Sequence, residues 1–186
     1  FLMQTNMPFY WYAPKKVWIG SNGYIAFNNV NVASPFPVIP EPGAPNDYVA
    51  CLMSDLNFTG TGNTGTCWYF DDPTITIVSW LDLPFWTSVA PGYTGENSFQ
   101  VILNKLDSTI TVQYMEQTGF SFNGDLLTGI ESLTGDIGLQ HSADTYPQTG
   151  YAVRYYAPAV PLIDIIDASV EWVSDESSKG SSLKRF

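Results

Sequence analysis

The chain has 186 residues, of which 45% are hydrophobic and 15% aromatic, so it can build a core and is not disordered over most of its length. Only 13% of the residues are charged, and 18 acidic against 7 basic residues give a formal net charge of -11. This balance excludes nucleic acid and anionic membrane surfaces as partners, because both need clustered Lys and Arg. No apolar run approaches the roughly 20 residues of a membrane helix, so we expect no membrane insertion.

The first strong element is a hairpin over 17–27, in which β-branched and aromatic residues alternate on either side of Asn22-Gly23. This dipeptide tolerates positive φ at both central positions of a two-residue type I′ turn. Before the hairpin, Met7–Tyr12 reads as an aromatic strand led by Pro8. A hairpin this apolar needs a second sheet to cover it, which predicts a β-sandwich.

Five prolines between Pro35 and Pro45 predict a loop that crosses from one sheet to the other. The next strand, 48–55, is apolar on both faces and is expected in the middle of a sheet. The later strands are predicted at 66–72, 74–80, 97–104, 109–115, 127–131, 136–140 and 151–156. The fold class is therefore all-β, an antiparallel two-sheet β-sandwich with hairpin connections over 1–157 and a C-terminal extension over 158–186.

The two cysteines, Cys51 and Cys67, lie in consecutive predicted strands joined by a Gly/Thr-rich loop over 57–65. Antiparallel neighbours can bring such positions within disulfide distance, and the low charge and Thr/Asn/Gly-rich composition are typical of a secreted protein. We therefore predict a disulfide between them, with a pair of buried free thiols as the alternative. Two Cys and one His do not make a zinc set, so no such metal site is expected.

Oxygen donors suited to Ca²⁺ lie near the ends of neighbouring predicted strands, at Asp55, Asn57, Asp71 and Asp72. No Asp-x-Asp-x-Asp-Gly loop accompanies them, so the alternative is a set of solvated turn carboxylates. The single histidine, His141, stands beside Ser142 and Asp144, too close in one loop to supply a separate nucleophile, base and orienting acid. We expect no catalytic residue and no enzymatic activity.

The long segment over 83–95 holds three aromatic residues, Phe85, Trp86 and Tyr93. Exposed beside Asp and Asn donors, they would stack on sugar rings, which makes a carbohydrate-binding β-sandwich the alternative function. In a simpler interpretation, Phe85 and Trp86 close an end of the sandwich.

Several of these segments follow one another in a characteristic order along the chain. Ser21–Phe27, a proline-rich crossing and Cys67–Phe70 are followed by Ile77–Trp80 and Asn97–Leu103, and a closing Tyr151–Tyr155 ends the series. Over roughly residues 6–157 this series resembles the nidogen-like extracellular domain and related β-sandwich modules of secreted and surface proteins in bacteria. The resemblance implies an extracellular, non-enzymatic module for adhesion or matrix-like assembly, and it transfers no catalytic residue.

The extension after Pro158 departs from that pattern. Residues 162–173 read as a strand with Leu162, Ile166, Val170 and Trp172 on one face, and 174–186 form a Ser-rich polar tail. We expect 162–173 to be an arm that docks on a partner chain or an adjoining domain by adding a strand to an exposed sheet edge. Alternatively, it is a further strand of the same sandwich. The predicted function is protein–protein contact in a cell-surface or secreted assembly, with no cofactor.

Overall fold

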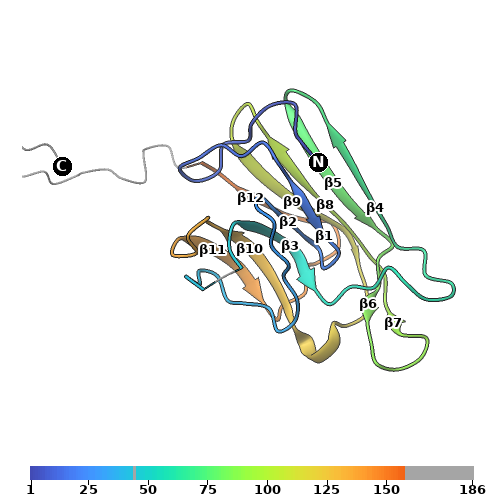
Figure 1. The fold of residues 1–186 in the computed structure, drawn as a ribbon. Coiled ribbons are helices and arrows are strands. Elements are labelled where there is room, and N and C mark those ends of the chain that lie inside the picture. The colour runs from blue at the N-terminus through green and yellow to red at the C-terminus, as the bar shows by residue number, and fades with distance from the viewer. Residues whose placement is uncertain (44, 158–186) are drawn as a thin grey trace, which may run out of the picture.

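The computed structural model describes residues 1–43 and 45–157, and these form two large antiparallel sheets stacked face to face, together with a small two-stranded sheet, β6-β7 (Figure 1). The first sheet has the order β1-β2-β3-β10-β11 and the second the order β12-β9-β8-β5-β4. The strand bounds are β1 Trp18–Gly20, β2 Tyr24–Ala26, β3 Tyr48–Ser54, β4 Thr66–Asp71, β5 Ile75–Leu81, β6 Phe85–Trp86, β7 Tyr93–Thr94, β8 Asn97–Asn104, β9 Thr109–Gln117, β10 Leu126–Glu131, β11 Gly138–Ala143 and β12 Tyr151–Tyr155. A short 3-10 turn, η1, spans Phe122–Gly124. The predicted all-β sandwich is confirmed.

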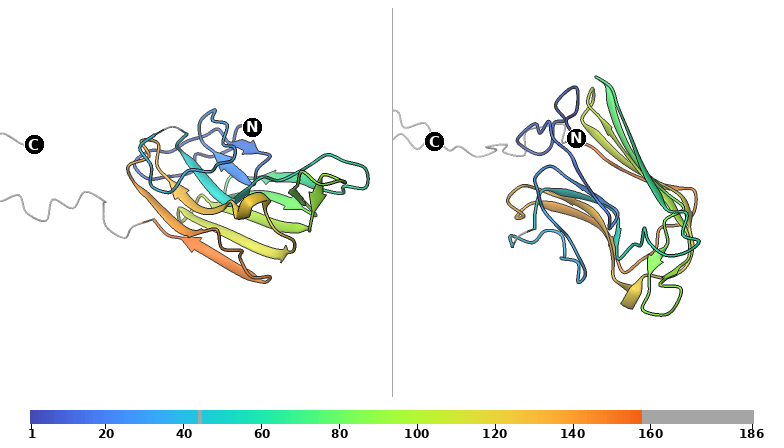
Figure 2. Two further views of the ribbon diagram at one scale, coloured as in Figure 1. Left: turned by 90° about the horizontal axis from the view of Figure 1, so that it is seen from below. Right: turned by 45° about the vertical axis from the view of Figure 1, so that its right-hand side comes forward.

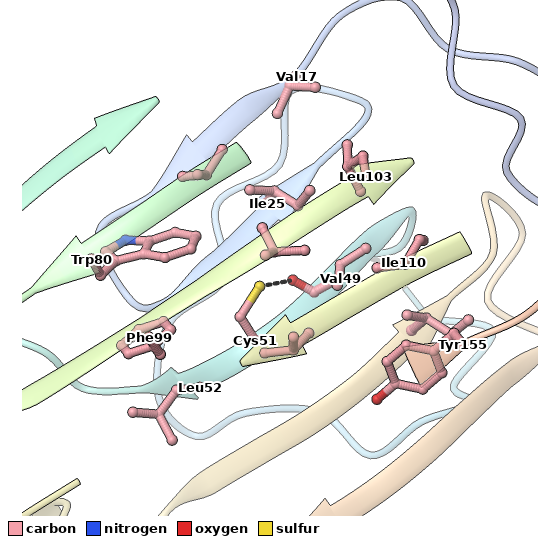
Figure 3. Close-up of a cluster of buried hydrophobic side chains, with 14 of the residues drawn as sticks. Val17, Ile25, Val49, Cys51, Leu52, Trp80, Phe99, Leu103, Ile110 and Tyr155 are labelled. Atoms are coloured by element: carbon pink, nitrogen blue, oxygen red, sulfur yellow. Dashed lines mark hydrogen bonds between the residues drawn. The ribbon is translucent and has the colours of Figure 1, made fainter. Parts of the chain in front are cut away.

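The core lies between the two sheets, and the alternation of each strand decides which residues enter it. In β5, Thr76, Val78 and Trp80 are fully buried while their neighbours are partly exposed. Strand β8 contributes Phe99, Val101 and Leu103 to the same core. Figure 3 shows Trp80 and Phe99 facing Ile25, Val49 and Cys51 of the first sheet.

The outer faces of the two sheets differ. A second apolar cluster covers the first sheet, where Val32 and Ile39 of the proline-rich segment pack on Tyr48, Ala50 and Met53. All seven residues of β3 are consequently buried, as predicted for a central strand. Outward-facing side chains of β4 and β5 in the second sheet remain partly or fully exposed. The views in Figure 2 show β4 at the far side of its sheet from β12.

Three predictions are wrong. The proline-rich loop does not cross to the other sheet, because it joins β2 to β3, which pair with each other in the first sheet. The first hairpin pairs Gly20 with Tyr24 and so has a three-residue loop, in which Gly23 has a φ of 73° and Asn22 has no positive φ. A type I′ turn is thereby excluded, and Gly23 lies so close to the Leu52 carbonyl that a side chain would collide with it. Met7–Tyr12 forms no strand, because the chain reverses at Tyr10, whose φ is 52°, and Phe9 pairs with Tyr12 instead.

Candidate interaction surface

The predicted disulfide is wrong: the structure describes both cysteines, and both are free thiols. Cys51 lies in β3, which pairs with β2 and β10, whereas Cys67 lies in β4 of the opposite sheet, which pairs with β5. The chain changes sheets between the two strands, so the cysteines are never antiparallel neighbours. Cys51 is fully buried, its sulfur lies 3.6 Å from the Val49 carbonyl oxygen, and burial raises the pKa of its thiol. Cys67 is exposed, so the alternative of two buried thiols holds only for Cys51.

The four candidate Ca²⁺ ligands do not come together. Asp55 and Asp71 lie near opposite ends of β5. The Asp55 carbonyl accepts a hydrogen bond from the N–H of Trp86, which follows the last residue of β5, at 2.8 Å. Asp71 pairs with Thr76, near the first residue of β5. The carboxylate of Asp72 already accepts from the N–H groups of Thr74 and Ile75. In residues 1–43 and 45–157, no cluster of three or more His, Cys, Asp or Glu could hold a metal ion. Asp71 and Asp72 are therefore structural turn carboxylates.

The three aromatic residues of 83–95 do not form an exposed platform. Phe85 is fully buried in the main core. Trp86 packs edge to face on Phe122 at a ring separation of 4.9 Å, and the Tyr93 hydroxyl donates to the Thr61 carbonyl at 2.8 Å. The expectation of an exposed sugar-stacking row is thus wrong for this loop, because Phe85 fills the interior and Trp86 packs across the end of the sandwich.

The predicted docking residues of the arm, Leu162, Ile166, Val170 and Trp172, lie outside the described residues, as does the whole of 158–186. Within the described part of the chain, no helix is long and apolar enough to cross a membrane.

The structure does display an exposed strand edge that the sequence reasoning missed. Strand β4 is the last strand of the second sheet, and its residues from Thr66 to Phe70 are all exposed. Trp68, Tyr69 and Phe70 are 64%, 58% and 51% exposed. An edge strand of this kind normally carries Lys, Pro or a bulge that blocks further pairing. The six residues of β4 include neither Lys nor Pro, and their register with β5 is unbroken.

The backbone of β4 offers hydrogen-bonding groups on its free side. The Asp72 N–H donates to the Ile75 carbonyl at 3.0 Å, so Asp72 directs its backbone groups toward the chain of β5. In an antiparallel ladder every second residue directs its backbone groups to the same side, so Trp68 and Phe70 also direct theirs toward β5. Cys67, Tyr69 and Asp71 consequently direct their N–H and C=O groups away from the sheet. The side-chain amide of Gln4 donates to the Asp71 carbonyl at 3.0 Å, which confirms this direction. Cys67 and Tyr69 are left as the open pairing positions.

Neighbouring groups fix the Asp71 end of this edge and the Tyr69 side chain near its middle. Lys105, whose side chain is 0% exposed, donates to the Asp71 carboxylate at 2.6 Å and to the Asp72 carbonyl at 2.5 Å. Burial alone raises the pKa of Asp71, but hydrogen bonds from Lys105, Thr76 and the Gln4 N–H outweigh it, and the pKa lies below 3.8. On the inward side, the Phe1 ring stacks on Tyr69 at 4.3 Å. The edge is thus held in place and carries no unpaired charge.

The outward face of the second sheet extends this surface. The register places Trp68 beside Ser79 and Phe70 beside Ile77, and Ile102 follows on β8. Further along, Gln100 and Gln113 are joined by a side-chain hydrogen bond of 2.6 Å and line a shallow hollow of about 370 Å³. The outward side chains of β4, β5 and β8 are uncharged, although the chain carries a net charge of -11. We call β4 together with Ser79, Ile77 and Ile102 the β4 surface.

The opposite side of the sandwich is different. There the ring of His141 in β11 stacks on Tyr151 in β12, with centroids 5.8 Å apart, so side chains bridge the two sheets. Arg154 adds a charge to β12, and its Nε donates to the Thr111 hydroxyl at 2.9 Å.

The uncharged run Thr66–Phe70, apolar on both faces, was the signal of an open edge in the sequence. It could not be interpreted without knowing the strand order.

Comparisons of the chain with models of known protein families, with curated proteins and with solved structures found no match.

Proposed function

We propose that this protein is a non-enzymatic extracellular module that makes protein–protein contacts in a cell-surface or secreted assembly, and that the β4 surface is its contact site. The observation that carries the proposal is the open edge of β4, with three aromatic side chains more than half exposed beside unpaired backbone groups. A partner strand added to such an edge gains main-chain hydrogen bonds, and its side chains alternate over the two faces.

Contact chemistry agrees with this interpretation. Protein interfaces are enriched in Trp, Tyr and Phe and depleted of charge at their centre, and Trp and Tyr supply most of the residues with large binding energies. The β4 surface has Trp68 and Tyr69 at its middle, and its one carboxylate in the strand, Asp71, is neutralised by Lys105. The largest contiguous apolar patch exposed on a soluble protein is often an interaction site.

The extracellular and adhesive parts of the proposal rest on the sequence. The low charge content is typical of secreted and surface proteins, and the ordered series of motifs resembles the nidogen-like domain and related bacterial surface modules. Carbohydrate binding through Phe85, Trp86 and Tyr93 has lost its support, because Phe85 is fully buried.

Site-specific photo-crosslinking tests the contact site. Benzoylphenylalanine replaces Phe70 on the β4 surface or, as the control, Leu139 on β11, two apolar positions that are 51% and 58% exposed. Irradiation with the surface protein fraction of the source cells is expected to give several-fold more protein adducts from position 70, and Trp68→Lys in the same chain should abolish them.

Equal adduct yields at the two positions would contradict the proposed site. A glycan array provides the contrasting result: binding to an oligosaccharide that Trp68→Ala removes, without protein adducts at position 70, would make this face a carbohydrate site instead.

A further inference from the structure

We infer that a second copy of this chain is a partner of the β4 surface, and that the two β4 strands pair antiparallel about a two-fold axis at Trp68. The inference rests on the proposed function and adds the partner and the register. It joins the two second sheets into one continuous sheet.

The register follows from the free backbone groups. In a hydrogen-bonded antiparallel pair, both residues must direct their N–H and C=O toward the other strand. On β4 these residues are Cys67, Tyr69 and Asp71, and the Asp71 carbonyl is already bonded to Gln4. Only a centre at Trp68 pairs the two open positions with each other, because it sets the Cys67 of each copy opposite the Tyr69 of the other copy.

The neighbouring registers are poorer. A centre at Tyr69 would set Cys67 opposite the second copy's Asp71, whose carbonyl Gln4 already occupies. With the centre at Trp68, Asp71 lies opposite Gly65, at the ends of the ladder only. A centre at Cys67 would set Tyr69 opposite Gly65 and leave the aromatic ring without a cross-strand partner. If the axis fell between two residues, a residue with free backbone N–H and C=O groups would lie opposite a residue whose groups are already bonded to β5.

Side chains and charge also favour self-pairing. At a two-fold axis the same patch must complement itself, so an unpaired charge near the axis would meet its own copy. Within Thr66–Phe70 all residues are uncharged, and Asp71 at the end of the strand is paired with Lys105. The two Trp68 rings lie on the same outward face, and Phe70 lies opposite the second copy's Thr66.

The size of the contact predicts a weak dimer. Three aromatic side chains more than half exposed offer roughly 300 Å² for each copy, and so about 600 Å² for both. Stable complexes bury at least about 1,200 Å², so we expect reversible dimerisation that becomes visible only at high protein concentration.

A disulfide trap in the full chain tests the register. Cys67→Ser removes the exposed native thiol, and Trp68→Cys then places two thiols across the axis. Their Cα atoms would be about 4.5 Å apart in a non-hydrogen-bonded pair, within disulfide range. The matched control combines Cys67→Ser with Phe70→Cys, since two thiols at position 70 would be separated by four residues of strand, on the order of 13 Å. With oxidised glutathione, we expect several-fold more covalent dimer from position 68 than from position 70.

Sedimentation equilibrium of the wild-type chain, from about 10 µM to about 1 mM, tests the association itself. We expect a dimer fraction that rises with concentration, and at least a tenfold weaker association in Trp68→Lys, which sets two like charges at the axis. Equal trapping at positions 68 and 70, or dimers that persist in Trp68→Lys, would overturn the register.

Two further outcomes separate this inference from the proposed function. A wild-type chain that stays monomeric overturns self-pairing, while Trp68-dependent protein adducts at position 70 would still support the contact site with a different partner. In the full chain, the double variant Ile166→Asp, Val170→Asp should dimerise as the wild type does. Loss of dimers in that variant but not in Trp68→Lys would assign the contact to the predicted arm and overturn the inference.

Discussion

Trp80→Ala is expected to lower the free energy of unfolding by about 3–5 kcal/mol, the usual range for removing a large aromatic side chain from a core. Trp80 is fully buried on the inward face of β5, and its ring stacks on Phe99 at 5.0 Å (Figure 3). Alanine would leave a cavity between the two sheets, where the surrounding strands cannot collapse without losing their pairing. Urea denaturation followed by far-ultraviolet circular dichroism measures the loss.

Trp68→Ala is the matched control, because Trp68 lies on the neighbouring strand but faces outward and is 64% exposed. We expect it to change the free energy of unfolding by less than about 1 kcal/mol while it weakens association at the β4 surface. A similar loss of stability in both variants would show that β4 belongs to the core, and would contradict its assignment as a contact strand.

Lys105→Met is expected to destabilise the fold by roughly 2–3 kcal/mol, because it leaves the Asp71 carboxylate without its buried cation. The Lys105 ammonium joins the turn after β8 to the last residue of β4 through Asp71 and Asp72. Methionine keeps most of the volume, so the loss reports the charge and the hydrogen bonds rather than a cavity. Lys16→Met, which removes an amine lying over the Trp18 ring at 4.3 Å, is a surface control expected to cost less than about 1 kcal/mol.

The pH dependence gives this prediction a second readout. The pKa of Asp71 lies below its ordinary value of 3.8, so the folded state binds fewer protons than the unfolded state in this range. The stability that the pair supplies is therefore present above pH 3.8 and decreases as the pH falls below it. Lys105→Met should reduce this acid-induced loss, and Asp71→Asn, which removes the titrating group itself, should remove the contribution of this carboxyl. An unchanged pH profile in both variants would contradict the role of the pair.

Local patterns were sufficient for much of the fold. The strands predicted at 74–80, 97–104 and 109–115 are confirmed as β5, β8 and β9, because a strand with one buried face must alternate. The double-sided apolar run over 48–55 correctly predicted a central strand. The proline series was wrongly taken as a crossing between sheets, because β2 and β3 on either side of it pair in the same sheet.

Long-range arrangement could not be obtained in the same way. The disulfide prediction took Cys51 and Cys67 as neighbours because their strands are consecutive, but the chain changes sheets at 57–65. For the same reason, β4 could not be recognised as an edge. The burial of Phe85 agrees with the simpler interpretation of 83–95, in which Phe85 packs against the sandwich. Strand order depends on packing between distant segments, and no short-range pattern specifies it.

Amide hydrogen exchange at β4 tests the central claim, that this edge pairs with another protein strand, most directly. The N–H groups of Trp68 and Phe70 point to β5 and should exchange slowly at every protein concentration, so they are internal controls. The N–H groups of Cys67 and Tyr69 point away from the sheet and should exchange fast in dilute solution, then several-fold more slowly at about 1 mM, where copies pair. If Cys67 and Tyr69 are already protected in dilute solution, the β4 edge is not open and the contact site is contradicted. If they exchange equally fast at both concentrations, two copies do not pair through β4.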